Sequence, residues 1–315
     1  MFDILTVGEM LIDLTQTGIS AQGIPQYTAF PGGAPANVAV AAARLGAKTA
    51  FIGKVGSDAF GKLLADTLRQ NGVDTGGMKM TGEANTTLAV VSLQENGERD
   101  FAFYRKGFAD TLLSADEISD DRLQNTHVLH FGSVSLTDEP SRGATFSAVK
   151  RAKDLGVCVS YDPNYRASLW SSRALAIEMM KQPLGMVDIL KISDEELPLL
   201  TGDDDPETGT EMLSREYGIA LILLTLGAKG AYYRFGDKTG VCEGIKVKVA
   251  DTNGAGDTFL GAFLSGMTAK GKYRPDSLTE DEIRELVVFS NKAAAITTSR
   301  SGAIPAMPTL NEIIR

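Results

Sequence analysis

One short stretch of this sequence carries the clearest chemistry, Asp-Thr-Asn-Gly-Ala-Gly-Asp-Thr-Phe at residues 251–259. Apolar residues follow it at helical spacing, so the Gly-Ala-Gly turn falls in the first turn of a helix. There, backbone N–H groups have no partner within the helix and the helix dipole favours negative charge, as a phosphate requires. Asp257 would stand beside that phosphate and take a proton from an attacking hydroxyl group. A helix cap made by Asp257 or Asp251 is the alternative that this stretch leaves open.

A second glycine-containing stretch, Gly-Gly-Ala-Pro-Ala-Asn at residues 32–37, precedes an alanine-rich helical segment. Its two glycines would let a ligand approach the backbone, and Asn37 offers both a hydrogen-bond donor and an acceptor. Asp13 lies in an apolar run, where a carboxylate indicates either a half-exposed strand or a contact with a polar ligand. Helix initiation by Asn37 and simple exposure of Asp13 are the competing interpretations.

A third polar group, Asp-Pro-Asn-Tyr-Arg at residues 162–166, closes a predicted strand. Ligands of α/β sheets bind at the carboxyl ends of the strands, so Asn164 and Arg166 fall where a ligand is expected. A solvated loop is the alternative. The two histidines, His127 and His130, share one predicted strand and suggest neither a Ser-His-Asp arrangement nor a zinc site, so we interpret both as structural.

These motifs must be positioned by a chain in which short apolar runs alternate with amphipathic helices. The predicted core strands are residues 4–8, 49–55, 128–132, 157–162, 189–192 and 221–225. The predicted helices are residues 35–45, 60–71, 141–155, 174–180, 194–200, 257–269 and 281–297. This alternation is typical of βαβ units, and it predicts an α/β fold with a mostly parallel sheet between two layers of helices.

Two segments, residues 11–30 and 86–106, do not fit the alternation. The second contains two β-type runs on either side of Glu-Asn-Gly-Glu at residues 95–98, which is a hairpin signal. We predict that the two segments form a small β-sheet that projects from the main domain as a lid. The sequence shows no internal repeat and no low-complexity linker, so residues 1–315 are predicted to be one domain that contains these insertions.

Composition limits the classes of function. The chain has 315 residues, of which 43% are hydrophobic, so it can bury a large core. A net charge of −9 and a pI near 4.9 argue against a nucleic-acid surface and favour small polar substrates. Cys158 and Cys242 lie in separate apolar segments, which indicates reduced core cysteines and a cytoplasmic protein. The start of the chain is acidic, unlike a signal peptide, and no apolar run approaches the ~20 residues of a membrane span.

Together, residues 32–46 (GGAPANVAVAAARLG) and 251–259 (DTNGAGDTF) resemble the two signatures of the PfkB, or ribokinase-like, carbohydrate kinases. Five further blocks resemble the family in the same order: residues 53–61 (GKVGSDAFG), 162–166 (DPNYR), 191–196 (KISDEE), 225–230 (TLGAKG) and 301–305 (SGAIP). The resemblance covers essentially the whole chain. It implies a ribokinase-like three-layer α/β/α fold with a small β-sheet lid. Within the family, GGAPANVA, FYRKGFAD, DPNYRASLW and KISDEELPLLTG are most similar to bacterial fructokinases.

The resemblance also implies roles for individual residues. Asp257 matches the catalytic base, and Gly254, Ala255 and Gly256 match the anion hole for the γ-phosphoryl group. The positions that match the sugar site are Asp13, Gly32, Gly33 and Asn37, with Arg105 and Arg166 as further polar residues near the sugar or the phosphates. The positions that match the nucleotide site are Asn164, Lys191, Ser193, Thr225, Gly227, Gly230 and Asn291.

The same resemblance implies ATP, Mg²⁺ and a site for K⁺. The family's Asn-x-x-Glu block, which organises Mg²⁺ through water, appears here with Ser193 in place of the Asn and with Glu196 retained. The positions that match the family's monovalent-cation loop, where backbone carbonyl groups would bind K⁺, are Asp251, Asn253, Thr297, Arg300 and Gly302.

The function that the resemblance implies is phosphorylation of a sugar primary hydroxyl by ATP, with D-fructose as substrate and fructose 6-phosphate as product. A kinase of 2-keto-3-deoxygluconate or another sugar is the alternative within the family. A non-catalytic sugar sensor is the alternative from a different class. Lid strands with an exposed apolar face suggest a partner lid, so we expect a homodimer with no nucleic-acid or membrane partner.

Overall fold

The structure is a computed structural model that describes residues 1–93 and 99–314. Its large sheet has nine strands in the order β13-β12-β11-β10-β9-β8-β1-β4-β5. The strands are parallel except at the β11–β12 and β12–β13 pairs. Their bounds are β1 (Phe2–Val7), β4 (Thr49–Gly56), β5 (Asp74–Thr81), β8 (Thr126–Gly132), β9 (Cys158–Asp162), β10 (Ile189–Ser193), β11 (Leu221–Thr225), β12 (Gly230–Phe235) and β13 (Lys238–Glu243).

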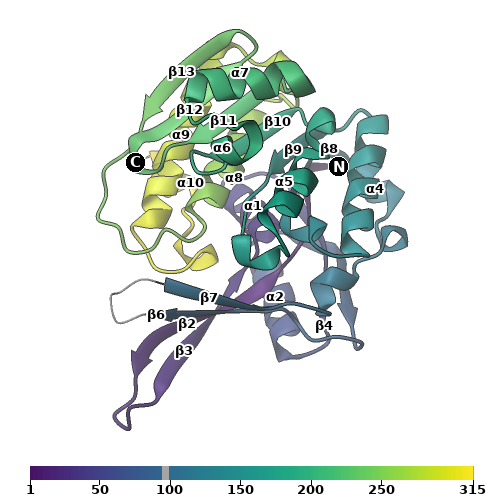
Figure 1. The fold of residues 1–315 in the computed structure, drawn as a ribbon, viewed down its shortest axis with the longest axis vertical. Helices are drawn as coiled ribbons and strands as arrows, with labels where there is room; N and C mark the ends of the chain where they lie inside the picture. Colours follow the sequence, from purple (N-terminus) through teal and green to yellow (C-terminus); the bar gives the residue numbers. More distant parts are fainter. Residues whose placement is uncertain (94–98, 315) are drawn as a thin grey trace.

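Helices cover both faces of this sheet (Figure 1) because successive side chains of a buried strand point to opposite faces. In β1, Ile4 packs in the cluster of α1 (Ala34–Arg44), α8 (Ala255–Ala269) and α9 (Glu280–Thr298), whereas Leu5 packs in the cluster of the opposite layer. That layer includes α3 (Asp120–Gln124), α4 (Ser141–Asp154), α5 (Arg173–Lys181), α6 (Leu197–Thr201) and α7 (Pro206–Tyr217). On the first face, α2 (Ala59–Gln70) and α10 (Leu310–Ile314) complete the cover. The predicted α/β/α fold is confirmed.

The six predicted core strands are confirmed to within two residues at each end, and so are all the predicted helices except one. The helix predicted from residue 194 begins at Leu197 instead, because Glu196 accepts a hydrogen bond from the Ser193 N–H and closes a turn ahead of it. The sequence prediction omitted β5, β12, β13, α3, α7 and α10. The predicted turn at residues 95–98 lies outside the described residues.

The second sheet has four strands in the order β3-β2-β6-β7 and projects from the body of the molecule (Figure 1). Its strands are β2 (Leu11–Ile19), β3 (Pro25–Gly32), β6 (Leu88–Leu93) and β7 (Arg99–Tyr104). They come from the two segments that the sequence assigned to a lid. That the sheet closes over a substrate stays a prediction.

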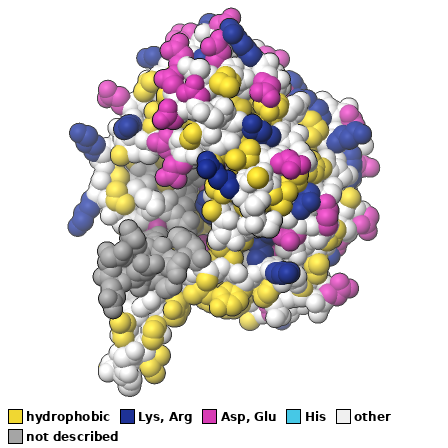
Figure 2. All heavy atoms as spheres, viewed as in Figure 1, with side chains coloured by type: hydrophobic (Ala, Val, Ile, Leu, Met, Phe, Trp, Pro, Cys, Tyr) yellow, Lys and Arg dark blue, Asp and Glu magenta, His cyan; other side chains and the backbone are white. Residues whose placement is uncertain are grey.

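The far end of the projecting sheet carries exposed apolar side chains, as Figure 2 shows. Ile19, Ile24 and Tyr27 are 64%, 62% and 44% exposed. Elsewhere, the large apolar side chains of β4, β8 and β9 are buried, and so are those of β1 except for the half-buried Phe2. Among the helices of the described residues, none combines the length and apolar character that a membrane-spanning helix needs.

Candidate active site

A cavity of about 910 Å³ lies at the carboxyl ends of the parallel strands, beside the base of the projecting sheet. Residues that follow β1, β8, β9, β10 and β11 line it, together with the starts of α1 and α8. Its volume suits a small-molecule ligand, and its position is where open α/β sheets bind ligands. The motifs at residues 32–37, 162–166 and 251–259 therefore meet in one place.

The Gly-Ala-Gly turn begins α8, as the sequence predicts. Gly254 is the N-cap with a φ of 75°, and a side chain there would lie 2.9 Å from the Cβ of Ala303. Ala255 is the first residue of the helix, and Asp257 the third. Gly254, Gly256 and Asp257 all line the cavity. The first N–H groups of an α-helix of this length are an anion site in principle, and their use for a phosphoryl group stays a prediction.

Asp257 is buried and contacts Asn37 from the start of α1. The Asn37 Nδ2 group donates a hydrogen bond of 2.8 Å to Oδ2 of Asp257. Burial raises the pKa of Asp257 to about 6, and repulsion by Asp162 acts in the same direction, whereas Asn37, Lys191 and Arg166 lower it. A carboxyl group that titrates there is ionised at neutral pH and remains basic enough to accept a proton.

Asn37 and Asp13 present acceptors to the same cavity. The Oδ1 atom of Asn37 is buried without a hydrogen-bond partner. Asp13 accepts a hydrogen bond of 3.3 Å from Nδ2 of Asn253, and burial raises its pKa to about 6. A side chain on Gly32 would lie 2.5 Å from the Asp13 carboxylate, so glycine leaves room for that group. The cavity therefore contains the unpaired amide oxygen of Asn37, the carboxylate of Asp13 and, at Gly32, backbone that a ligand can approach.

Glu9 is a cavity residue that the sequence prediction missed. It is 3% exposed, and its Oε1 atom accepts a hydrogen bond of 3.0 Å from the Ala34 N–H at the start of α1. Its Oε2 atom is buried without a hydrogen-bond partner, and burial raises its pKa to about 7. Gly33 packs on the backbone of Glu9, where a side chain would lie 2.6 Å from the Glu9 carbonyl oxygen. The sequence does contain a signal for Glu9, because Glu9 is a carboxylate in the same apolar run as Asp13.

The predicted nucleotide residues divide into two groups. The residues that line the cavity are Asn164, Lys191, Ser193, Thr225 and Gly227. Gly230 and Asn291 are not among its lining residues. A side chain on Gly230 would lie 2.1 Å from the Cys242 carbonyl oxygen, and Asn291 donates hydrogen bonds of 3.0 and 3.2 Å to the carbonyl oxygens of Cys242 and Glu243. Packing against β13 explains why a glycine stands at residue 230 and an asparagine at residue 291. Their contact with a nucleotide stays a prediction.

Glu196 joins two of the strand ends. Its Oε1 atom accepts the Tyr165 N–H at 2.7 Å, and its Oε2 atom accepts the Ser193 N–H at 2.8 Å. Among the described residues, no group of three or more His, Cys, Asp or Glu side chains is arranged to hold a metal. The buried carboxylate of Glu196 in the cavity fits Mg²⁺, which commonly keeps several waters and binds one or two carboxylates plus substrate phosphates.

The residues of the predicted cation loop lie together. Asp251 accepts the Asn253 N–H at 2.9 Å and the Gly302 N–H at 3.1 Å, and its own N–H donates to the Thr298 carbonyl oxygen. The side chain of Thr297 contacts that of Thr258, and the side chain of Arg300 pairs with Glu312. Two backbone segments are thus held side by side, which fits a cation bound by carbonyl oxygens, and the site stays a prediction.

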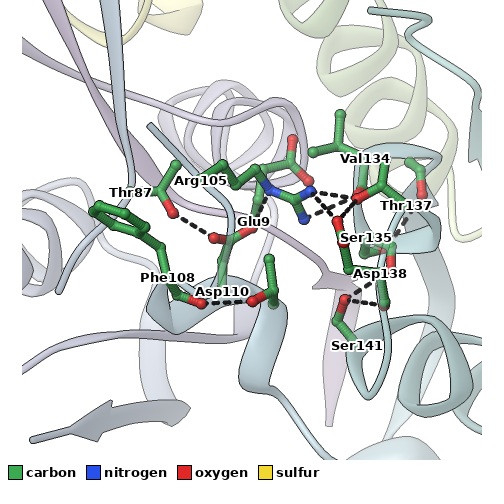
Figure 3. Close-up of polar contacts among 12 residues, drawn as sticks. Glu9, Thr87, Arg105, Phe108, Asp110, Val134, Ser135, Thr137, Asp138 and Ser141 are labelled. Atoms are coloured by element: carbon green, nitrogen blue, oxygen red, sulfur yellow. Dashed lines mark hydrogen bonds and ion pairs between the residues drawn. The ribbon is translucent and has the colours of Figure 1, made fainter. Parts of the chain in front are cut away.

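The two predicted arginines occupy different places. Arg166 is exposed and lines the cavity. Arg105 is buried in a polar network beyond it (Figure 3). Its guanidinium pairs with Asp110 at 2.6 Å, donates to the Val134 carbonyl oxygen at 3.0 Å, and also contacts Thr137 and Asp138. Arg105 therefore joins the end of β7 to the segment after β8. Contact between Arg105 and a sugar stays a prediction.

Replacement of Arg105 by Met is expected to lower the free energy of unfolding by about 3–5 kcal/mol, because it leaves the buried carboxylate of Asp110 without its cation. Urea denaturation measures the change. The matched control is Arg69→Met, which breaks an ion pair with Asp66 whose side chains are 58% and 60% exposed, and it should cost less than about 1 kcal/mol. Equal effects of the two substitutions would contradict the structural importance of Arg105.

Comparisons with known proteins identify the family and the fold of this chain. The chain matches the model of the pfkB family of carbohydrate kinases over residues 1–310. It is 43% identical to Fructokinase-1 of Zea mays over 315 residues, which cover 99% of this chain and 96% of that protein. A fructokinase from Xylella fastidiosa with bound ATP superposes with a TM-score of 0.91 at 32% identity, over 100% of this chain and 98% of that one. A fructokinase double mutant from Vibrio cholerae O395, bound to fructose, ADP and potassium ion, gives 0.89 at 35% identity, over 99% and 96%.

Proposed function

This chain belongs to the pfkB family of carbohydrate kinases, and from that membership we propose that it is a fructokinase, which transfers the γ-phosphoryl group of ATP to the C6 hydroxyl of D-fructose. The observation that carries the proposal is the buried Asp257 in the first turn of α8, in a cavity that also presents Asp13 and Asn37. A helix N-terminus can bind the phosphate and a general base beside it can take the proton of the alcohol, and phosphoryl transfer to an alcohol uses both roles. The similarity to proteins named fructokinases selects the sugar.

In the proposed reaction, Asp257 accepts the proton of the sugar hydroxyl while that oxygen attacks the γ-phosphorus. The new O–P bond forms as the bond to the β-phosphate oxygen breaks, and ADP leaves. Backbone N–H groups of the Gly254–Gly256 turn stabilise charge on the transferring oxygens, and they cost little reorganisation because the helix already orients them. Glu196 would hold Mg²⁺ through water, and the ion would supply further neutralisation of the phosphate charge.

We propose that the sugar hydroxyls donate hydrogen bonds to Asp13 and to the unpaired Oδ1 atom of Asn37. Leaving a buried acceptor without a donor costs about 1–3 kcal/mol, so a polyhydroxyl ligand gains by filling the place. A sugar acid such as 2-keto-3-deoxygluconate is the second candidate, and the exposed cation of Arg166 in the cavity favours it. A sugar sensor without catalysis is the third.

The remaining assignments rest on the family. ATP would lie along the ends of β10 and β11, beside Thr225 and Gly227. Potassium would bind between residues 250–253 and 297–302, and omission of K⁺ from the assay tests that site. Cys158 and Cys242 are free and buried, which supports a cytoplasmic location.

We propose a homodimer in which the exposed apolar ends of two projecting sheets cover each other. The patch consists of Ile19, Ile24 and Tyr27. Light scattering of the whole chain measures the mass in solution, and Ile24→Asp should convert the dimer to a monomer. A wild-type mass of one chain would contradict the proposal.

The experiment that tests the function is ADP release with ATP, Mg²⁺ and K⁺ across fructose, ribose, tagatose, glucose and 2-keto-3-deoxygluconate. We expect the highest kcat/KM with fructose. A higher value with the sugar acid would establish the second candidate and leave the reaction type unchanged. Binding of a sugar without ADP formation from any of them would establish the sensor.

A further inference from the structure

Glu9 lies in the short connection between β1 and β2, and its two carboxylate oxygens have different surroundings. The Oε1 atom accepts the hydrogen bond of 3.0 Å from the N–H of Ala34, the first residue of α1. The Oε2 atom is buried and has no hydrogen-bond partner among the described residues. The side chain also lines the cavity. One oxygen therefore has a structural role, and the other is free to accept a hydrogen bond from a ligand.

The structural role does not require a carboxylate. The N-cap of α1 is Gly33, which has no side chain to cap the helix. Glu9 replaces that cap, because its Oε1 atom accepts one of the N–H groups that lack partners within the helix. The amide oxygen of a glutamine could accept the same bond. Burial of an ionised group costs more free energy than burial of an amide, so an acid at residue 9 indicates a second use of the side chain.

The neighbouring charges do not satisfy Glu9. It lies beside the network of Arg105 (Figure 3), in which the guanidinium pairs with Asp110 at 2.6 Å. The Oε2 atom of Glu9 takes no part in that network. Burial raises the pKa of Glu9 to about 7, although its hydrogen bonds with backbone N–H groups and the charge of Arg105 lower it. A hydroxyl group that donates to Oε2 would satisfy the buried acceptor without adding a charge.

The electrostatic surroundings place Glu9 and Asp257 at different ends of the cavity. Besides burial, the charged groups that act on the pKa of Asp257 are Asp162, Lys191 and Arg166. For Glu9 the corresponding groups are Arg105 and Asp110. Val134 also lines the cavity, and its carbonyl oxygen accepts a hydrogen bond of 3.0 Å from Arg105. A hexose that presents its C6 hydroxyl to Asp257 would therefore direct its C1 and C2 atoms toward Glu9.

We propose that Glu9 is a substrate-binding residue, whose Oε2 atom accepts a hydrogen bond from a hydroxyl at the C1–C2 end of the sugar while its Oε1 atom holds the start of α1. The proposal rests on the proposed kinase function and deepens it, because it names the residue that recognises the end of the ketose remote from the transferred phosphoryl group. The hydroxyl keeps its proton. Glu9 therefore acts in recognition of the sugar, and Asp257 remains the base.

The first test is Glu9→Gln in the whole chain. The Ala34 N–H holds the amide oxygen of the glutamine, so the NH₂ group replaces the free oxygen and only the second acceptor is lost. We expect the Kd for fructose, measured by calorimetry without ATP, to rise by about 10-fold or more, the contribution of a hydrogen bond to a charged group. The Kd for ADP should stay the same. An unchanged Kd for fructose would mean that Glu9 only caps the helix, and it would overturn the proposal.

The matched control is Glu282→Gln. Glu282 accepts the Thr279 N–H at 2.8 Å at the start of α9 and is not among the residues that line the cavity. This substitution should leave the Kd for fructose unchanged. A rise equal to that of Glu9→Gln would show that loss of a carboxylate at a helix start is enough to weaken binding, and it would overturn the specific role of Glu9.

The second test removes the hydroxyl groups of the sugar one at a time. The analogue 1-deoxyfructose lacks the C1 hydroxyl, and 2,5-anhydromannitol lacks the C2 hydroxyl. We expect one of them to bind the wild type about 10-fold more weakly than fructose does, and to bind Glu9→Gln as tightly as fructose does. Wild-type affinities for both analogues equal to that for fructose would overturn the proposal, even if Glu9→Gln fails to fold. A wild type that neither binds fructose nor forms ADP with any sugar would reject the proposed function itself.

Discussion

Replacement of Asp257 by Asn is expected to lower kcat with fructose by about 10²- to 10⁴-fold, the usual contribution of a general base. Asn preserves the size of the side chain and can still contact Asn37, but it cannot accept the hydroxyl proton. The wild-type carboxyl group has a pKa of about 6 because burial disfavours its charge. The wild-type kcat should therefore fall as the pH drops through about 6, since the base becomes protonated. Steady-state kinetics between pH 5 and 8, roughly one unit or more on each side, measure both effects.

Folding of this variant provides the control. A carboxyl group whose folded-state pKa is raised contributes stability that is fully present below its unfolded pKa of 3.8 and is lost as the pH rises through about 6. Asn carries no such charge, so Asp257→Asn should unfold at the same or a higher urea concentration at pH 7. The exposed substitution Asp66→Asn should leave both kcat and stability unchanged. Full activity in Asp257→Asn would reject Asp257 as the base.

The sequence predicts the central sheet because its strands are buried on both faces and read as continuous apolar runs. The strand Leu221–Thr225 is an example, and its bounds agree at both ends. Strands near the sheet edges give weaker signals. The strand β5 contains Asp74, Gly76 and Gly77, whose composition is typical of a turn, and its parallel pairing with β4 overrides that preference.

The cavity residues are predictable where a local motif fixes their backbone, as in Gly254–Asp257. Residues that act through contacts with residues far away in the sequence are not predictable in this way. Arg105 has the type and family position of a ligand, but its environment depends on Asp110 and on the segment after β8, which no local pattern reveals. The pairing of Lys191 with Asp162 likewise depends on the order of β9 and β10 in the sheet. The sequence shows which residue types could act in the site. It does not show the partners that set their charge and orientation, because those depend on the order of the strands in the sheet.

Removal of the Asp13 carboxylate by Asp13→Ala is expected to lower kcat/KM for fructose by about 10²-fold or more. A hydrogen bond to a charged group contributes about 1.5–3 kcal/mol, and a carboxylate can accept two sugar hydroxyls. The loss should appear mainly in the KM for fructose if Asp13 binds the ground state and the transition state equally. Initial rates at varied fructose and saturating ATP measure it. The KM for ATP should stay the same, because Asp13 lies on β2 of the projecting sheet, whereas β10 and β11 belong to the large sheet.

Asp13→Asn separates recognition of the sugar from support of the local structure. Its amide keeps one acceptor oxygen close to Asn253 and loses the charge, so kcat/KM for fructose should lie between those of the wild type and Asp13→Ala. A rise in the KM for ATP equal to that for fructose would mean that the substitution distorts the whole cavity. Equal kcat/KM values in the wild type and Asp13→Ala would reject Asp13 as a sugar ligand. The hydrogen bond that the Asp13 carboxylate accepts from Asn253 would then be the remaining role of an acid at residue 13.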